Sequence, residues 1–498
     1  MPTFENIIPT GPAAGILPAG NRTPIRVFGN EHIRKTFEEN TLTQALNARR
    51  APGVTDLVLN PDAHSGYGAP IGCVLISPDH LYPGPVGVDV KCSMSLLQLD
   101  LPTEALSEKP LRRALINAIG ERLPTGFHAS QQCRKAPKFT DEDAELAVTE
   151  GASPEVCARF SIPEEWTLRC EDFQHVGHDG TSDTLRARLQ AHKDAGLFRK
   201  YSAKLHQIGT YGGGNHFGEC EDVRLADDSE ETARRADVFG LKSGHAAFLS
   251  HCGSRGFGNI LAQNQFQTLA AFFERWSIPF PGEDKKLVYT PIDTPQADAY
   301  WDDMMLGGNF ATVNHLVINR MVLEAFQEVL PGTQGALVYY ISHNFIRREP
   351  IGRENALVFV HRKGATRAYP AGHFVLENTP FFETGHPILL PGNPMDGSSV
   401  MVALDGASAS NYSINHGAGR QMGRQAAKRA LDAKAVDQSF RDADILTNCR
   451  NYPLDEAPAA YKNFQEVLNT VQEAGLAREV ARLNARFVIK DEESPADD

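Results

Sequence analysis

Hydrophobic and polar positions along the chain switch repeatedly between a strand-like period of two and a helix-like period. β-rich runs predict strands over 56–101, and again within 336–404 at ALVYYIS, ALVFVHR, PILL and SVMVAL. Amphipathic stretches predict helices near 33–50, 104–123, 183–207, 258–277, 295–330 and 459–484, with a further helix opening at 416. The elements lack regular βαβ spacing. We therefore expect an α+β fold in which central β-sheets are flanked by helices.

Two segments fall outside this pattern. Residues 126–182 are polar and show no clear periodicity, so we predict an irregular surface insertion there. Residues 491–498, DEESPADD, predict an acidic disordered tail. No Gly/Ser-rich or Pro-rich linker divides the remaining sequence. We expect residues 1–490 to form one large domain.

Composition places the chain among ordinary globular proteins. Of its 498 residues, 41% are hydrophobic and 22% are charged. No window approaches the roughly 18 uninterrupted apolar residues of a membrane span, and the N-terminus lacks the basic region of a secretory signal. We expect a soluble cytoplasmic protein with no membrane partner.

Charge and cysteine content narrow the function classes. The 49 Lys and Arg against 62 Asp and Glu give a net charge of −13, which argues against a general polyanion binder but allows a local basic groove. Eight cysteines in 498 residues are too sparse for a disulfide scaffold, and the absence of a CxxC pair excludes a zinc ribbon. We expect reduced thiols, so a cysteine near metal-ligand residue types becomes notable.

Five motifs place ligand-type side chains beside glycines or strand ends. They are PVGVDVKCSM, GTYGGGNHFGE, LSHCGSRGFG, VYYISHNFIRRE and YSINHGAGRQMGRQAAKRA. Taken singly, each fits a structural role such as a tight turn, a strand end or a core residue. Taken together they supply a mixed oxygen, sulfur and nitrogen donor set suited to a transition metal, namely Asp89, Cys92, His216, His251 and His343. No HExxH spacing is present, and spacing alone leaves both interpretations open.

Local geometry adds three expectations. Asp89 and Cys92 are three residues apart, so the backbone must bend after Asp89 if both face one site. His416 precedes Gly-Ala-Gly-Arg at the start of a predicted helix, where it is either a phosphate-facing nucleophile or an N-cap. Arg255 lies in a Gly/Ser turn, where it either binds a phosphate or is solvated.

The motifs together resemble the RtcB family of RNA ligases, whose order they follow over residues 60–490. The matching segments are NPDAHSGYGAPIG (60–72), GPVGVDVKCSM (84–94), GTYGGGNHFGE (209–219), SHCGSRGFG (250–258), SHN (342–344), VHRKGATRAYPAG (360–372), NHGAGR (415–420) and APAAYKNFQEV (457–467). HRKGATRA and HGAGR in one chain are especially specific.

The resemblance implies two Mn²⁺ ions and a GTP-dependent covalent mechanism. The manganese ligands would be the five residues of the donor set, with Cys92 bridging the two ions. His416 would carry GMP, and Arg255 would meet an RNA phosphate. The residues that would contact the guanylate are Asn215, Phe217, Glu219, Asn344, Gly417, Ala418, Gly419, Tyr461 and Lys490.

The implied activity joins an RNA 3′-phosphate or 2′,3′-cyclic phosphate end to a 5′-hydroxyl end, in RNA repair or tRNA splicing. Two alternatives are a metal-dependent phosphoesterase that acts on cyclic-phosphate ends without ligation and a non-catalytic RNA-binding relative. Retention of His416 and Lys490 argues against the phosphoesterase. The sequence does not identify the RNA substrate, an activator protein or the oligomeric state.

The chain also departs from the family pattern. Lys91 stands where Gly or Asn is usual, Cys252 replaces a common Thr, and Asn393 in PGNPMDGSS replaces a common Ser, which leaves the nucleotide preference open. NFATVNH (309–315) lacks the usual Trp and Arg, and the 126–182 segment is unusual.

We expect a basic groove that binds RNA. Its candidate residues are Arg255, Arg362, Lys363, Arg367, Arg420 and Arg424.

Overall fold

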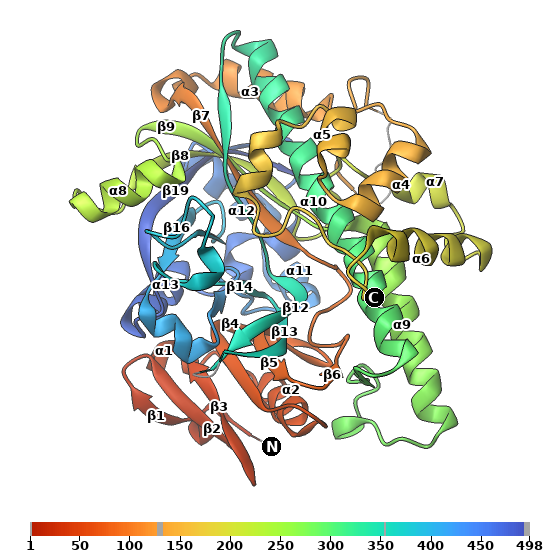
Figure 1. Cartoon of the computed structure of the whole chain (residues 1–498). Helices are drawn as coiled ribbons and strands as arrows, with labels where there is room; N and C mark the ends of the chain where they lie inside the picture. Colours follow the sequence, from red (N-terminus) through yellow and green to blue (C-terminus); the bar gives the residue numbers. More distant parts are fainter. Residues whose placement is uncertain (1, 127–132, 353–354, 493–498) are drawn as a thin grey trace.

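Two large β-sheets form the centre of the computed structural model, with helices on their outer sides (Figure 1). The structure describes residues 2–126, 133–352 and 355–492, so positions 493–498 of the predicted tail and 127–132 of the predicted insertion lie outside the described residues. The predicted α+β class is confirmed. No helix among the described residues is both long and apolar enough to cross a lipid bilayer.

The first sheet has seven strands in the order β1-β2-β3-β4-β5-β13-β12 and is antiparallel apart from the β3–β4 pair. Its strands are β1 Ile8–Gly11, β2 Ala14–Ala19, β3 Arg22–Phe28, β4 Asp56–Tyr67, β5 Ala69–Ser77, β12 Asn344–Ile351 and β13 Ala356–Lys363. Because side chains alternate between the faces of a strand, Leu57 and Leu59 pack with α2 (Glu39–Arg50), whereas Val58 faces the second sheet.

The second sheet has eight strands, ordered β11-β7-β9-β8-β19-β16-β15, with β18 pairing to β19. Its strands are β7 Ser93–Pro102, β8 Phe217–Leu225, β9 His245–Cys252, β11 Gly335–Ser342, β15 Pro387–Pro391, β16 Ser398–Ala403, β18 Leu446–Thr447 and β19 Ala477–Lys490. Two small ladders complete the strands, formed by β6 His80–Leu81 with β10 Thr290–Pro291 and by β14 Ala365–Arg367 with β17 Ser413–Asn415.

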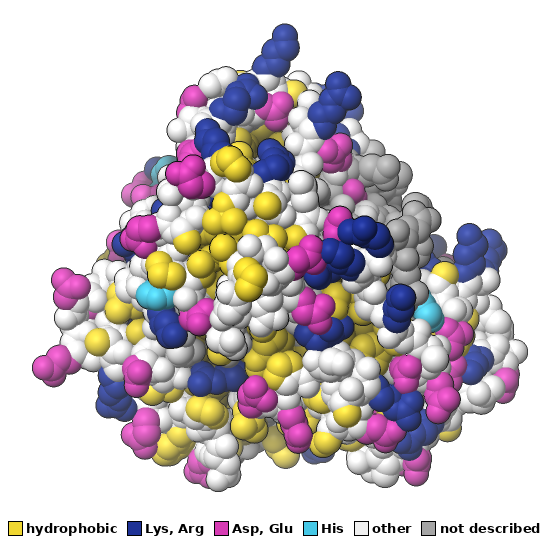
Figure 2. All heavy atoms as spheres, turned by 90° about the horizontal axis from the view of Figure 1, so that it is seen from above, with side chains coloured by type: hydrophobic (Ala, Val, Ile, Leu, Met, Phe, Trp, Pro, Cys, Tyr) yellow, Lys and Arg dark blue, Asp and Glu magenta, His cyan; other side chains and the backbone are white. Residues whose placement is uncertain are grey.

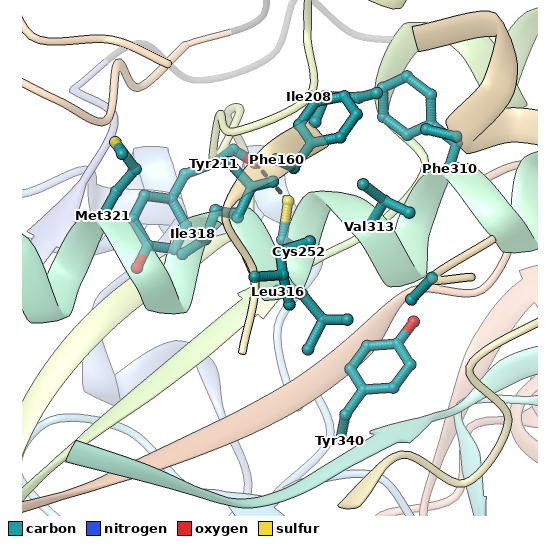
Figure 3. Packing of buried hydrophobic residues seen from close by; sticks show 14 of the residues in the cluster. Phe160, Ile208, Tyr211, Cys252, Phe310, Val313, Leu316, Ile318, Met321 and Tyr340 are labelled. Atoms are coloured by element: carbon teal, nitrogen blue, oxygen red, sulfur yellow. Dashed lines mark hydrogen bonds between the residues drawn. The ribbon is translucent and has the colours of Figure 1, made fainter. Parts of the chain in front are cut away.

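Apolar side chains join these layers. Val58 and Val74 of the first sheet lie in one buried cluster with Met94 and Leu249 of the second. The outer face of the second sheet packs against α10 (Pro295–Val329), a long helix that is almost wholly buried (Figures 1 and 3). Apart from the exposed edge at β1, the sheets are thus largely covered on both faces, which explains why many of their strands are apolar on both sides.

The remaining helices surround these layers. They are α1 Glu31–Arg34, α3 Lys109–Gly120, α4 Asp141–Glu150, α5 Pro154–Phe160, α6 Ser182–Asp194, α7 Tyr201–Leu205, α8 Glu230–Phe239, α9 Arg255–Arg275, α11 Arg424–Ala430, α12 Ala433–Asp442 and α13 Phe464–Glu473. The helices predicted near 33–50, 104–123, 258–277 and 295–330 are confirmed. The stretch 183–207 is two helices, α6 and α7, because Gly196 between them has φ +64°.

The expectation of an irregular 126–182 segment is wrong. Its described part contains α4, α5 and a 3₁₀ helix at Glu164–Arg169. Phe160 and Trp166 are buried in the same cluster as Phe310 of α10, and Figure 3 shows Phe160 among the side chains around that helix. Caps mark both helices: Thr140 forms a capping box at α4, and Ser153 caps α5. These caps were the local signal for helix that the polar composition obscured.

The expectation of one helix over 459–484 is also wrong. α13 ends at Glu473, Gly475 follows with φ +67°, and the chain continues as β19. The Ala, Arg, Glu and Leu residues of β19 favour helix locally. Pairing with β8 on one side and β16 on the other overrides that preference, because it satisfies the backbone groups of a long central strand.

Candidate active site

A tight turn before β7 brings two of the predicted metal ligands together. Lys91 has φ +53°, and the Cys92 amide donates to the Asp89 carbonyl at 3.1 Å. This is the bend after Asp89 that the sequence required. Cys92 Sγ consequently lies 3.1 Å from His251 Nε2, and Asp89 Oδ2 lies 2.8 Å from His216 Nε2.

Three histidines complete this group from neighbouring strand ends. His216 directly precedes β8, His251 lies in β9, and His343 separates β11 from β12. His216 Nε2 is 3.5 Å from Cys92 Sγ, and His251 Nε2 is 3.4 Å from His343 Nε2. The five side chains that the sequence proposed as metal ligands therefore form one continuous cluster. Within it, Cys92, His216 and His251 are buried and close enough together to share a metal ion.

Hydrogen bonds fix the ring orientation of two of these histidines. The Nδ1 atoms of His216 and His251 lie 3.0 Å from the carbonyl oxygens of Tyr211 and Asn215, respectively. A carbonyl only accepts, so each Nδ1 carries a proton and each Nε2 points into the donor cluster. Nε2 of His251 faces Cys92, whereas Nε2 of His216 lies nearest the Asp89 carboxylate. This is the orientation in which imidazole binds a metal.

Burial shifts the pKa values of several side chains in the donor set. It lowers the pKa values of His251 and His343 well below the usual range, and it raises the pKa of the Cys92 thiol well above it. Burial alone would raise the pKa of Asp89, but the neighbouring His216 brings it below its usual value. His343 Nδ1 is buried without a hydrogen-bond partner. Neutral imidazoles at His251 and His343, the Asp89 carboxylate and a thiol that a cation would deprotonate fit a transition metal.

His416 lies beside this cluster on the loop after β17. Its ring centroid is 4.8 Å from that of His343. Its Nδ1 is 2.6 Å from Oδ2 of Asp62, a fully buried residue of β4, and its backbone amide donates to the same oxygen at 3.2 Å. The carboxylate accepts a hydrogen bond from Nδ1–H, so Nε2 keeps its lone pair. Sequence reasoning assigned no role to Asp62, although the residue lies in the NPDAHSGYGAPIG motif.

The helix predicted to open at 416 is wrong. Residues 416–423 are irregular, and α11 begins at Arg424. Gly419 has φ +75°, and a Cβ at that position would lie 2.3 Å from the Asp62 carbonyl oxygen. The glycine therefore allows the His416 loop to pack against β4 in a left-handed conformation. His416 is not at a helix N-terminus, so a helix dipole does not assist it.

A second polar cluster lies at the end of β19. Lys490 Nζ donates to the Gly214 carbonyl at 2.8 Å and lies 3.6 Å from Glu456. Tyr461 donates to the same Glu456 at 2.5 Å, and Arg420 pairs with it at 3.2 Å. Glu456 thus connects two of the predicted guanylate residues, Tyr461 and Lys490. No sequence motif had indicated it.

The other predicted guanylate residues divide into exposed and structurally engaged positions. Asn215 is exposed, and Phe217 packs edge-on against His251 with the ring centroids 5.6 Å apart. Glu219 is buried in β8, and its Oε1 atom has no hydrogen-bond partner. Asn344 accepts a hydrogen bond from the Gly364 amide at 2.8 Å. Gly417, Ala418 and Gly419 are buried in the His416 loop.

Arg255 lies behind the glycine-rich turn at the start of α9. It is 7% exposed, and its guanidinium donates to Thr210 Oγ1 at 3.1 Å and to the Gly126 carbonyl at 3.0 Å. A Cβ on Gly212 would overlap this guanidinium, so that glycine allows the arginine to lie against the turn. The structure therefore gives Arg255 a supporting contact with the turn that carries His216.

The expected basic groove is not exposed. Arg362 is fully buried and pairs with Glu349 at 2.6 Å, and Arg367 pairs with Glu349 at 2.6 Å and with Asp172 at 3.2 Å. Lys363 is buried against backbone carbonyls. Of the six candidates, Arg424 is exposed. Figure 2 shows positive and negative side chains interspersed over one face of the molecule. Acidic partners neutralise most of the motif arginines.

These features together define a protein with a buried cluster of cysteine and histidine side chains close enough to hold a metal ion, and with a carboxylate-oriented histidine beside it. The family model described as tRNA-splicing ligase RtcB matches residues 44–491. Among curated relatives, the tRNA-splicing ligase RtcB of Archaeoglobus fulgidus is 31% identical over 95% of both chains. That of Thermococcus kodakarensis is 30% identical over 94% of this chain and 95% of the relative.

A eukaryotic relative gives the same result. The RNA-splicing ligase RtcB homolog 1 of Entamoeba dispar is 32% identical over 90% of this chain and 81% of its own length. The chain belongs to the RtcB family, which confirms the resemblance found in its motifs.

Proposed function

We propose that this protein is a GTP- and Mn²⁺-dependent RNA ligase. It joins RNA 3′-phosphate or 2′,3′-cyclic phosphate ends to 5′-hydroxyl ends, in RNA repair or tRNA splicing, through a covalent His416–GMP intermediate. Family membership and the names of the relatives support an RNA ligase. The observation that carries the covalent step is the 2.6 Å contact between His416 Nδ1 and Asp62, beside the donor cluster.

The donor set would hold the metal. Asp89, Cys92, His216, His251 and His343 would bind two Mn²⁺ ions, with Cys92 shared between them. Bound Mn²⁺ would neutralise charge on phosphate oxygens during nucleotidyl transfer. The tautomers of His216 and His251 are already set for this role by their Nδ1 hydrogen bonds.

His416 would act as the nucleophile toward GTP. Its Nε2 lone pair attacks the α-phosphorus, a P–N bond forms, and the bond from that phosphorus to the bridging oxygen breaks to release pyrophosphate. The ring becomes cationic in this step, and the Asp62 carboxylate stabilises it through the Nδ1–H. In our proposal Asp62 therefore orients the His416 ring and stabilises its cationic form, as the aspartate of a Ser-His-Asp triad does for its histidine.

Two displacements would complete ligation. An oxygen of the RNA 3′-phosphate attacks the guanylate phosphorus, and the P–N bond to His416 breaks. The 5′-hydroxyl oxygen then attacks the RNA 3′-phosphorus, and GMP leaves as a new phosphodiester forms. A cyclic phosphate end is first opened by water. Tyr461, Lys490 and Glu219 are the residues we assign to guanylate binding, together with the other predicted positions.

Guanylylation with α-labelled GTP and Mn²⁺ tests the proposal. A phosphoramidate is labile in acid and stable in base, so the unaltered protein should form an adduct with those properties. His416→Ala should abolish the adduct and ligation while retaining bound metal. His245→Ala, which alters a histidine at the far end of β9, should behave as the unaltered protein does. An adduct on His416→Ala would refute the assignment of His416 as the nucleophile. Absence of any adduct on the metal-loaded protein would favour the phosphoesterase.

A further inference from the structure

Lys91 is a fully buried lysine placed between two residues of the donor set, Asp89 and Cys92. Its backbone amide donates to the Asn344 carbonyl at 2.7 Å. Its Nζ donates to the Asp172 carbonyl at 2.8 Å and to Thr312 Oγ1 at 2.7 Å. The same ammonium lies 2.8 Å from His175 Nε2. An ammonium without water needs such partners, so these contacts hold its side chain in one place.

Two of these partners belong to a short segment that we call the strap, residues 170–175. The strap contacts the site a second time. Glu171 Oε1 accepts from the Ser342 amide at 2.8 Å, and its carboxylate pairs with Arg347 at 2.5 Å. Ser342 directly precedes His343. The strap therefore touches the residue next to Cys92 and the residue next to His343, from outside the donor cluster.

The strap is itself held by the central helix. The His175 amide donates to Asn309 Oδ1 of α10 at 2.8 Å, and Asn309 Nδ2 donates back to the His175 carbonyl at 3.0 Å. At the other end, the Glu171 amide donates to the Tyr340 carbonyl of β11 at 3.1 Å. Anchored at both ends, the strap provides a fixed support for the residues that it contacts.

We propose that the strap positions the metal ligands Cys92 and His343, and that Lys91 is the positioning residue through which it acts. The proposal rests on the metal centre of the proposed function. Direct hydrogen bonds join Lys91 to Asp172 and His175, which lie in the described part of the 126–182 segment. We infer that the segment is part of the support of the metal centre.

Lys91→Met tests this, because methionine keeps the apolar stem and removes the donors. Titration of the metal-free full-length protein with Co²⁺ follows binding through the thiolate-to-cobalt absorption of Cys92. We expect affinity to fall about 10-fold or more, in the range seen when outer-shell partners are lost, with an altered absorption band. Hydrogen exchange should also increase in residues 170–175.

Arg112→Met is the matched control. Arg112 of α3 is likewise a fully buried cation, and it pairs with Asp444 at 2.7 Å and donates to the Arg486 carbonyl of β19 at 3.3 Å. It should lower stability but leave Co²⁺ affinity and absorption unchanged. Thr312→Val, which removes one acceptor of Lys91 with little change in shape, should weaken Co²⁺ binding less than Lys91→Met does.

The outcomes separate this proposal from the proposed function. Failure of the unaltered protein to bind Co²⁺ or Mn²⁺ would refute the metal centre. If the unaltered protein binds Co²⁺ and folded Lys91→Met binds it with the same affinity and absorption, the positioning role is wrong. If Lys91→Met does not fold, unchanged Co²⁺ affinity and absorption in Thr312→Val overturns the proposal.

Discussion

A hydrogen bond to one nitrogen of an imidazole ring determines what the other nitrogen can do. In His216 and His251 a backbone carbonyl accepts a hydrogen bond from Nδ1–H, which leaves Nε2 facing the donor cluster. In His416 a carboxylate accepts the hydrogen bond from Nδ1–H and adds a negative charge beside the ring. The first arrangement suits a neutral metal ligand, and the second suits a nucleophile that becomes cationic.

Asp62→Asn should therefore slow guanylylation while leaving metal binding intact. The amide lacks the charge that stabilises cationic His416, and its NH₂ group can turn toward Nδ1 and move the ring proton to Nε2. We expect a loss of about 10²–10⁴-fold in the rate of adduct formation, as for other carboxylate-oriented histidines. Rapid-quench measurement with labelled GTP provides the rate. Asp405→Asn, at an exposed position, is the control, and an unchanged rate in Asp62→Asn would contradict the assignment.

The buried carboxyl groups of β8 predict a pH dependence of stability. Burial raises the pKa of Glu219 to about 8 and that of Glu221 well above its usual value. The folded state therefore binds more protons than the unfolded chain between about pH 4.5 and 8, so the free energy of unfolding falls as the pH rises through that window. A neutral replacement of Glu221 should remove part of this fall.

Glu221→Gln should match the unaltered protein near the lower end of that window and exceed it in stability near the upper end. The gain in the free energy of unfolding should be at most about 1.4 kcal/mol per pH unit, because that is the free energy of one pKa unit for a single titrating group. Urea unfolding at several pH values measures it, and the exposed Glu383→Gln should follow the unaltered profile. Parallel profiles for Glu221→Gln and the unaltered protein would show that Glu221 does not carry the effect.

Turns and strand ends, more than the regular elements, position the reactive side chains. The turn at Lys91 brings Asp89 close to Cys92, and the glycine-rich turn places His216 at the start of β8. The loop after β17 carries His416. The periodicity of α9 and α10 predicted those helices correctly. Local propensity failed at β19, where cross-strand pairing outweighs it, and at α4 and α5, whose caps the polar composition obscured.

Gly364→Ala should reduce guanylylation without unfolding the protein. Gly364 links β13 to β14 with φ +65°, and an added Cβ would lie 2.4 Å from Ile71 Cγ2, 2.8 Å from the Gly72 amide nitrogen and 3.0 Å from His416 Cε1. The methyl group should displace the His416 ring. Gly372→Ala provides the control for backbone strain, because Gly372 has φ +74° with no atom within 4 Å of the added Cβ. Equal adduct formation by both variants would exclude a steric effect at His416.

At the scale of the whole molecule, the site joins the two large sheets. Cys92, His216 and His251 come from strands of the second sheet or their ends, whereas Asp62 comes from β4 of the first. His343 lies where the chain passes from β11 in one sheet to β12 in the other. A metal bound by the donor set, Asp89, Cys92, His216, His251 and His343, would therefore link segments that are distant in the sequence.

Mn²⁺ should stabilise the folded protein. At a concentration of 100 times its Kd, a ligand that binds only the folded state adds about 2.7 kcal/mol to the free energy of unfolding. Urea unfolding with Mn²⁺ and with EDTA measures the difference. Cys92→Ala should lose the stabilisation, whereas Cys157→Ala, which alters a buried cysteine of α5, should retain it on a lower baseline. An equal gain in both variants would exclude Cys92 as a ligand.

The donor types, the order of the motifs and most of the apolar strands and helices could be predicted from the sequence, because each depends on neighbouring residues. Three contacts are visible only in the folded molecule: Asp62 orients His416, Glu456 links Tyr461 with Lys490, and Glu349 neutralises Arg362 and Arg367. The Asp62–His416 contact joins residues 354 positions apart, and the Glu349–Arg362 pair depends on the pairing of β12 with β13. Periodicity and propensity describe neighbouring residues, so they carry no information about such contacts.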